Sequence, residues 1–230
     1  MHRFLVTDLS APTIALPADE AHHAVHVLRL RAGDRIALVD GRGTLAEATL
    51  LTADKRSCTA EVTAQQHTPD PAAGIHIAVA PTKSIDRFEW FLEKTTELGV
   101  ARITPLMTQR TERGHLRHDR LLKVLVSAMK QSQRTWLPQL DAPTSLPDLL
   151  PELAPQCYFG WCVGEHDAFA ARYDATRPVS MLIGPEGDFS EEEATLLRAH
   201  GAQAVSLGAA RLRTETAAIA VCAWMNLLHR

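Results

Sequence analysis

Two glycine-bearing segments in the C-terminal half of the chain have the residue types needed to hold a small ligand. Residues 184–187 read Gly-Pro-Glu-Gly and follow the apolar run 179–183, and the second segment begins at Gly208 and ends in Arg-Thr-Glu-Thr at 213–216. Because glycine has no Cβ, a flat ring or a backbone group can approach it closely. The same residues also fit ordinary strand-to-helix turns, so their spacing leaves both interpretations open.

The composition of these segments favours a ligand that carries little negative charge. Neither the dinucleotide fingerprint G-x-G-x-x-G nor the phosphate loop G-x-x-x-x-G-K-[ST] occurs in the chain. Pro185 and Glu186 stand where a pyrophosphate would need free N–H groups and no carboxylate. A nucleotide-dependent oxidoreductase is therefore disfavoured.

The second segment leads into a predicted helix and places a cation at an unfavourable position. Thr214 or Thr216 is a suitable N-cap, and Glu215 in the first turn interacts favourably with the helix dipole. Capping does not explain Arg213, because the dipole disfavours a cation at the positive end of a helix. Arg213 therefore needs another partner, which makes it a candidate for binding or chemistry.

The elements that position these segments alternate between strands and helices from residue 75 onward. We expect strands at 75–80, 103–107, 157–162, 179–183 and 204–207, and helices at 85–98, 117–132, 191–200 and 216–228. The third of these helices begins with a capping box at Ser190 and ends at Gly201. Continuous apolar strands alternating with helices indicate a mostly parallel sheet covered on both faces. Ligands of such sheets bind beyond the carboxyl ends of the strands, where both glycine segments lie.

The first 70 residues follow a different pattern, typical of a small barrel-like domain. Short strands are predicted at 2–6, 35–39, 44–51 and 57–65, and one helix at about 19–30. Residues 66–74 contain two prolines without apolar periodicity and are interpreted as a linker. The sequence thus predicts two domains, 1–70 and 74–230.

The composition is that of a globular protein, with 230 residues, 46% hydrophobic and 22% charged. No apolar run approaches the roughly 20 residues of a membrane span, and no signal-peptide pattern is present, so a cytoplasmic location is expected. His22 and His26 have metal-ligand spacing without an evident third ligand, so no metal site is expected. No C-x-x-C pair occurs, and reduced thiols are expected at Cys58, Cys157, Cys162 and Cys222.

The charge distribution contains one basic stretch although the formal net charge is −3. Between Arg110 and Arg134 there are seven Lys or Arg and two acidic residues, which is seven minus two, a local excess of five positive charges. Such a stretch could follow RNA phosphates or could be a solvated helix face. Charge alone does not choose between them.

Six motifs occur in order along almost the whole chain. Residues 22–34 read H-H-x-x-x-V-L-R-x-x-x-G-D, and the others lie at 1–4, 83–100, 131–134, 183–190 and 207–217. With them the chain resembles the bacterial 16S ribosomal RNA uridine-N3 methyltransferases, a family of the SPOUT superfamily. The chain departs from the family pattern at Asp188, where many members have a third glycine, and at 209–211, where Ala-Ala-Arg replaces Pro-Arg-Ile.

This resemblance implies a fold, a cofactor and partners. The fold would be a PUA-like β-barrel domain followed by an α/β SPOUT domain with a trefoil knot, assembled as a homodimer. The cofactor would be S-adenosylmethionine, and the substrate 16S ribosomal RNA of the small ribosomal subunit. Matched motif by motif, the cofactor contacts are Leu182, Gly184, Glu186, Gly187, Leu207, Gly208, Leu212 and Arg213.

Methylation at N3 of a uracil needs an unpaired base and help with the N3 proton. Arg213 is a candidate to stabilise the uracil anion, Glu215 a candidate base, and Arg110 could assist. The candidate RNA contacts are Arg3, Arg29, Arg31, Lys83, Arg87, Arg110 and Arg134. A non-catalytic ribosome-binding or assembly factor is the alternative, and it would have no use for the glycine loops.

Overall fold

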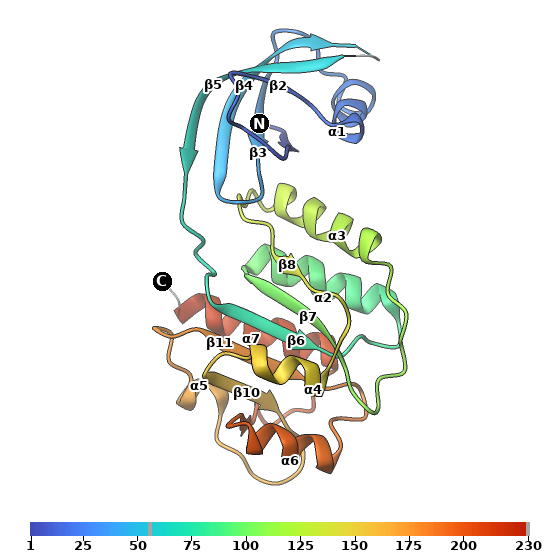
Figure 1. Cartoon of the computed structure of the whole chain (residues 1–230), viewed down its shortest axis with the longest axis vertical. Helices are drawn as coiled ribbons and strands as arrows, with labels where there is room; N and C mark the ends of the chain where they lie inside the picture. The colour runs from blue at the N-terminus through green and yellow to red at the C-terminus, as the bar shows by residue number, and fades with distance from the viewer. Residues whose placement is uncertain (55–56, 229–230) are drawn as a thin grey trace. The chain divides into compact units, whose positions relative to one another are not determined.

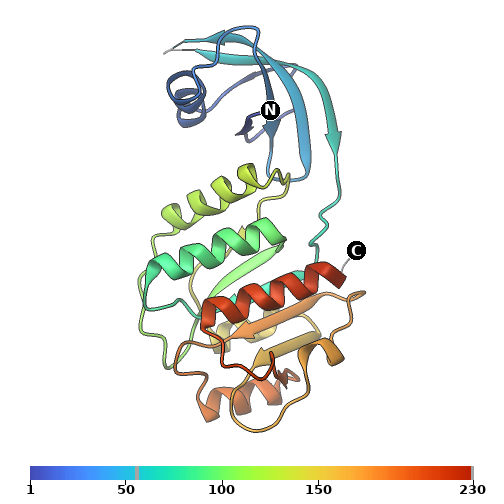
Figure 2. The same ribbon diagram turned by 180° about the vertical axis from the view of Figure 1, so that it is seen from behind.

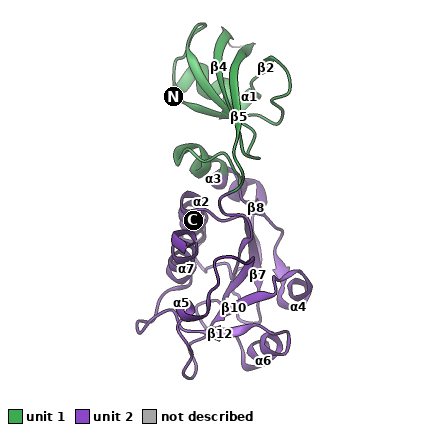
Figure 3. Ribbon diagram, turned by 90° about the vertical axis from the view of Figure 1, so that its left-hand side faces the viewer, with its two compact units in different colours: residues 1–70, 126–137 green, residues 71–125, 138–230 purple. Residues whose placement is uncertain are grey.

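The computed structural model describes residues 1–54 and 57–228, and its elements are shown in Figures 1 and 2. The chain divides into two compact units, coloured in Figure 3. The first consists of residues 1–70 and 126–137, and the second of 71–125 and the chain from 138 onward. The segment 126–137, which the sequence pattern places in the second domain, thus groups with the first unit.

The first unit is built on a five-stranded sheet with the strand order β1-β3-β4-β5-β2. Its strands are β1 (Arg3–Leu5), β2 (Thr13–Ala15), β3 (Arg35–Val39), β4 (Thr44–Ala53) and β5 (Cys58–His67). The β1–β3 pair is parallel, and the other pairs are antiparallel. Two register shifts between β4 and β5 bend the sheet around a core that includes Phe4, Ile36, Leu38 and Leu50. The three-residue β2 was not predicted, because so short a strand has no readable alternation.

The predicted helix at 19–30 is shorter and irregular in the structure. Helix α1 (Ala18–His22) continues directly into a π-helical turn, η1 (His23–Val27). Arg29 then adopts a left-handed backbone conformation, with φ 58°, which no α-helix can continue. The helix therefore stops before the predicted end.

Segment 126–137 is tied to the rest of the first unit by polar contacts. Lys130, near the end of α3 (His118–Gln131), forms a 2.7 Å ion pair with the buried carboxylate of Glu20. The indole N–H of Trp136 donates a hydrogen bond to the carbonyl of Thr68. Sequence periodicity carries no information about such long-range pairs, which explains why the domain division differs.

The second unit is a parallel sheet of seven strands with the order β12-β10-β11-β6-β7-β8, and β9 pairs with β7. Every strand pair in it is parallel, which confirms the predicted fold class. Its strands are β6 (Ile75–Val79), β7 (Arg102–Met107), β8 (Gln139–Leu140), β9 (Thr144–Ser145), β10 (Gln156–Gly160), β11 (Val179–Ile183) and β12 (Gln203–Val205).

Helices cover both faces of this sheet. Helices α2 (Ile85–Leu98) and α7 (Thr214–Leu228) lie side by side on one face, as Figure 2 shows. The other face carries α4 (Leu146–Leu149) and α6 (Glu191–Ala199), seen in front in Figure 1. The short elements η2 (Leu150–Glu152) and α5 (Phe169–Arg172), like β8, β9 and α4, were not predicted, because they span too few residues for a periodic pattern.

The parallel order brings the carboxyl ends of the central strands to one edge of the sheet. In register, Ile183 at the end of β11 pairs with Val79 at the end of β6, and Gly160 at the end of β10 pairs with Val205. The loops after β10, β11 and β12 therefore lie beside one another.

In the described part of the chain, no helix is long and apolar enough to cross a membrane.

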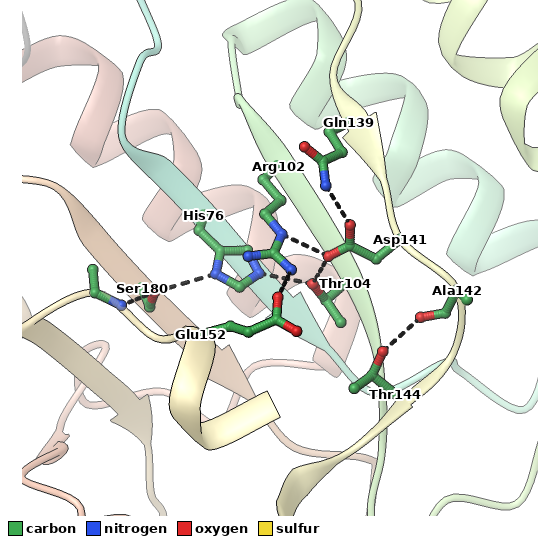
Figure 4. Close-up of polar contacts among 10 residues, drawn as sticks. His76, Arg102, Thr104, Gln139, Asp141, Ala142, Thr144, Glu152 and Ser180 are labelled. Atoms are coloured by element: carbon green, nitrogen blue, oxygen red, sulfur yellow. Dashed lines mark hydrogen bonds and ion pairs between the residues drawn. The ribbon is translucent and has the colours of Figure 1, made fainter. Parts of the chain in front are cut away.

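Near the amino ends of the strands, a buried histidine joins a chain of hydrogen bonds (Figure 4). The Thr104 hydroxyl donates its only proton to the Asp141 carboxylate, so it accepts from His76 Nε2–H at 2.8 Å. His76 Nδ1 then accepts from the Ser180 hydroxyl at 3.2 Å. Burial, and next the charge of Arg102, lower the pKa of His76 to about 4, against opposing effects of the Asp141 and Glu152 carboxylates.

We expect His76 to make the folded protein less stable in mild acid. The unfolded histidine takes up a proton near its ordinary pKa of about 6.5, whereas the native one stays neutral down to about pH 4. The free energy of unfolding should therefore fall between pH 7 and pH 5, with about 2 kcal/mol of the decrease due to His76. Urea unfolding at the two pH values measures this, and His76→Gln should lack that part of the decrease. Equal pH dependence in parent and variant would contradict the assignment.

Candidate active site

A cleft of about 1120 Å³ opens at the carboxyl edge of the second unit's sheet. Its walls are the loop after β10 (residues 160–166), the loop after β11 (183–191) and the loop between β12 and α7 (205–214), with Arg110 beside them. All three loops follow neighbouring parallel strands, so the sheet order alone brings them together. The sequence analysis predicted a ligand-binding site at this same edge of the sheet.

The loop after β11 folds into a tight turn that leaves little room for a side chain at its start. A Cβ on Gly184 would lie 3.1 Å from the backbone nitrogen of Phe189 and 3.1 Å from its ring. The turn closes through a 2.9 Å hydrogen bond from Asp188 N–H to the carbonyl of Pro185. Ser190 and Glu193 then form the predicted capping box of α6. A side chain at 184 would thus require Phe189 to shift by a few tenths of an ångström, so the packing of the loop favours glycine there.

Arg110 holds this loop from the side. Its guanidinium Nη1 donates to the carbonyl of Gly187 at 2.6 Å and to that of Phe189 at 3.1 Å. The Glu193 carboxylate accepts a second link, from the backbone N–H of Gln109 at 2.8 Å. Through these two hydrogen bonds, Arg110 stabilises the shape of the cleft wall.

The loop after β12 is joined, at the start of α7, to the loop after β11. The Thr214 hydroxyl donates to the carbonyl of Gly184 at 3.1 Å, and α7 begins at Thr214, two residues earlier than predicted. Gly208 has a φ of 117°, and a Cβ built on it would meet no atom within 4 Å. Gly208, which lines the cleft, therefore combines a backbone conformation that suits glycine with open space around its missing side chain.

Seven of the eight expected cofactor residues line this cleft: Gly184, Glu186, Gly187, Leu207, Gly208, Leu212 and Arg213. The eighth, Leu182, is fully buried in the core cluster with Phe159 and Phe189. Sequence reasoning missed the loop 160–166, although it also follows a predicted parallel strand. The carboxyl-end rule applied to that strand would have found it.

The cleft carries charges of both signs in nearly equal numbers. Arg110, Arg211 and Arg213 face a lining that also contains Glu165, Glu186, Asp188 and Glu191. Such a balance suits a zwitterionic or cationic ligand better than a polyphosphate. Glu215 is not part of the lining, because its side chain is only 6% exposed and lies 3.9 Å from the guanidinium of Arg87.

The expected RNA contacts divide between the two units. In the first unit, Arg29 and Arg31 are exposed, and Arg3 donates a 3.1 Å hydrogen bond to the backbone carbonyl of Arg134. Partial burial lowers the pKa of Arg3. In the second unit, Lys83 forms a 2.9 Å ion pair with Glu112. The structure thus brings Arg3 and Arg134 together and leaves Arg29 and Arg31 facing solvent.

Most cations of the basic stretch 110–134 have partners within the protein. Besides Arg110 and Lys130, Arg113 donates to the carbonyl of Lys83, and Arg120 pairs with Glu89. Arg117 pairs with Asp119 at 3.3 Å. These contacts reduce the number of cations in the stretch that are free to bind RNA phosphates.

Among the described residues, no group of three or more His, Cys, Asp and Glu could hold a metal ion.

Two family models match the chain. The model described as "RNA methyltransferase domain" matches residues 68–226, and the one described as "RNA methyltransferase PUA domain" matches residues 16–63. The first match contains all three loops of the cleft, and the second lies within the first unit.

The chain is similar to proteins and solved structures from several bacteria. It is 30% identical to the ribosomal RNA small subunit methyltransferase E of Synechocystis, over 94% of this chain and 73% of that protein. A probable rRNA-methyltransferase from Porphyromonas gingivalis superposes with a TM-score of 0.92 at 36% identity, covering 100% of this chain and 98% of that one. A ribosomal RNA small subunit methyltransferase E from Neisseria gonorrhoeae was solved bound to S-adenosyl methionine. It superposes with a TM-score of 0.88 at 27% identity, covering 99% of this chain and 98% of that one.

Proposed function

The chain belongs to the RNA methyltransferase family, and from this premise we propose that it transfers a methyl group from S-adenosylmethionine to N3 of a uridine in 16S ribosomal RNA. The observation that carries the proposal is the charge-balanced cleft built from three loops at the carboxyl edge of the sheet. A similar protein from Neisseria gonorrhoeae was solved with this methyl donor. The names of the relatives supply the small-subunit substrate.

The cleft residues fit S-adenosylmethionine. Gly208 leaves open space for the flat adenine ring, and the acidic lining residues suit a ligand that carries a sulfonium and an ammonium group. Arg211 and Arg213 offer partners for its carboxylate. The bound cofactor supplies an electrophilic methyl group, so the protein must mainly align donor and acceptor.

Arg213 would act on the uracil. As N3 forms its bond to the methyl carbon, the bond from that carbon to sulfur breaks and the N3 proton leaves to solvent. A cation beside the uracil carbonyl oxygens stabilises the anion from which the proton has gone. Arg213 is exposed in the cleft lining, and its side chain has no hydrogen bond or ion pair within the described residues. It is therefore available for this part.

Glu215 and Arg110 would support the site from outside the reacting atoms. Glu215, the earlier candidate for the base, is buried against Arg87 in the first turn of α7. In that position it can fix the start of the helix that carries Arg213. Arg110 would hold the loop after β11 through the carbonyls of Gly187 and Phe189.

The proposal includes RNA binding by both units and assembly as a homodimer in the cytoplasm. Arg29 and Arg31 are exposed in the unit that contains the match to the PUA domain model, where they would contact phosphates. Exposed apolar side chains near the end of α7, Trp224, Leu227 and Leu228, favour a protein contact. Light scattering of the full chain measures the assembly.

Incubating the protein with methyl-labelled S-adenosylmethionine and RNA tests the reaction. We expect label in 16S RNA, recovered as N3-methyluridine after digestion to nucleosides. Isolated small subunits and protein-free RNA, assayed in parallel, distinguish the substrate form. Binding of RNA without incorporation would instead support a non-catalytic ribosome-binding factor, and label on another atom would exclude the N3 assignment.

A further inference from the structure

Asp188 stands at the point of the cleft where the sequence departs from the family pattern. It lines the cleft in the turn after β11, and its backbone has a φ of 63°, in the left-handed region. A residue other than glycine adopts this conformation at a cost, although aspartate tolerates it better than most. A side chain kept at such a position calls for a compensating contact.

The carboxylate of Asp188 makes that contact across the cleft. Its Oδ2 accepts a 3.0 Å hydrogen bond from the backbone N–H of Cys162, in the loop after β10. Its Oδ1 accepts from the N–H of Phe189 at 2.8 Å. One side chain thus joins two of the three loops that form the cleft.

The Asp188 end of this link is itself held in place. The carbonyls on either side of Asp188, those of Gly187 and Phe189, both accept from Arg110. The N–H of Asp188 bonds to Pro185. The loop 160–166, in contrast, contains Gly164 with φ 86° and the exposed side chain of Val163. The contact therefore runs from a well-supported turn to a loop whose residues 162–165 are exposed.

We infer that Asp188 is a positioning residue of the cofactor cleft, which holds the loop 160–166 in its ligand-binding arrangement through the N–H of Cys162. The inference rests on the proposed function, because the ligand is taken to be S-adenosylmethionine. A loop that is already held in place loses less conformational freedom when the ligand binds, and affinity rises accordingly. In this chain aspartate supplies a link that glycine cannot make.

Three variants separate the link from its charge. Asp188→Gly removes the acceptor and suits the left-handed backbone, so the chain should remain folded. Asp188→Asn tolerates the same φ and keeps one oxygen that can accept from the Cys162 N–H, but it carries no charge and its amide nitrogen cannot accept from the Phe189 N–H. Glu192→Gln is the matched control, because it removes a negative charge from the exposed first turn of α6 without changing the cleft lining.

Hydrogen exchange and calorimetry on the full chain give the first two readouts. Without cofactor, Asp188→Gly should speed exchange of the Cys162 amide by about 10-fold, whereas Asp188→Asn should stay close to the parent. The Kd for S-adenosylmethionine should rise by about 10-fold in Asp188→Gly and change little in Asp188→Asn and Glu192→Gln.

The thiol of Cys162 gives a third readout that a purely structural role would not move. Burial, and next the charge of Asp188, raise the pKa of this thiol. Cys162 is exposed, whereas Cys58, Cys157 and Cys222 are buried. Asp188→Asn should therefore speed its reaction with a disulfide reagent while cofactor affinity is retained.

The outcomes separate this inference from the proposed function. A parent protein that fails to bind S-adenosylmethionine overturns both. A parent that binds, with an Asp188→Gly variant of equal affinity, overturns only the positioning role. Equal weakening by Asp188→Asn and Asp188→Gly also overturns it, because the charge and not the link would then be responsible.

Discussion

Replacing Gly208 with valine should abolish binding of S-adenosylmethionine at micromolar concentrations. The backbone at this position has φ 117°, which a β-branched residue adopts only with strain, and the added side chain would occupy open space at a residue that lines the cleft. We expect the Kd to rise by roughly 100-fold or more, about 2.7 kcal/mol or more of binding free energy. Isothermal titration calorimetry measures the change.

Gly201→Val provides the matched control for backbone strain. Gly201 has φ 90°, a Cβ on it would also meet nothing within 4 Å, and it does not line the cleft. Both variants should lose thermal stability by similar amounts, but only Gly208→Val should lose the cofactor. If Gly208→Val binds as tightly as the parent, the cofactor lies elsewhere.

Replacing Arg213 with alanine should lower kcat by roughly 100-fold at saturating cofactor and RNA. The expected loss is large because the guanidinium would stabilise charge that develops only as the uracil loses its proton. Folding should not suffer, since the substitution removes a cation from the positive end of α7. Single-turnover methyl transfer together with thermal unfolding measures both effects.

Arg211→Ala is the control for the general electrostatic field of the cleft. Arg211 lies in the same loop, lines the same cleft and is likewise exposed. A comparable loss of kcat in both variants would show that bulk positive charge matters, and not a specific contact of Arg213. Near-parental turnover of Arg213→Ala would remove Arg213 from the chemistry while leaving the family assignment intact.

The alternation of strands and helices predicted most of the second unit from sequence. Strand β11 was predicted with the bounds that the structure shows, and the capping box at Ser190 is present. These features depend on the order of residues that are near one another in the chain, so they can be predicted from the sequence. The trefoil knot that the resemblance implies depends on the path of the whole chain, and it stays a prediction.

The cleft could be predicted in outline and not in its contacts. Strand ends located two of its walls, because parallel strands place their following loops at one edge. The burial of Glu215 and the use of Arg110 as a clamp depend on partners far away in sequence, Arg87 and Gly187. The reaction that the resemblance implies made both residues candidates for roles near the reacting atoms, because the sequence does not show such distant partners.

The discontinuous composition of the first unit has a consequence for synthesis on the ribosome. Its last segment ends at residue 137, which is 137 minus 70, or 67 residues, after its first segment ends. At about 5–20 residues per second, this delay lasts roughly 3–13 s. Until Lys130 is added, near the end of this delay, the Glu20 carboxylate lacks its ion-pair partner in the finished protein. The nascent N-terminal sheet is therefore incompletely stabilised while residues 71–125 of the second unit are translated.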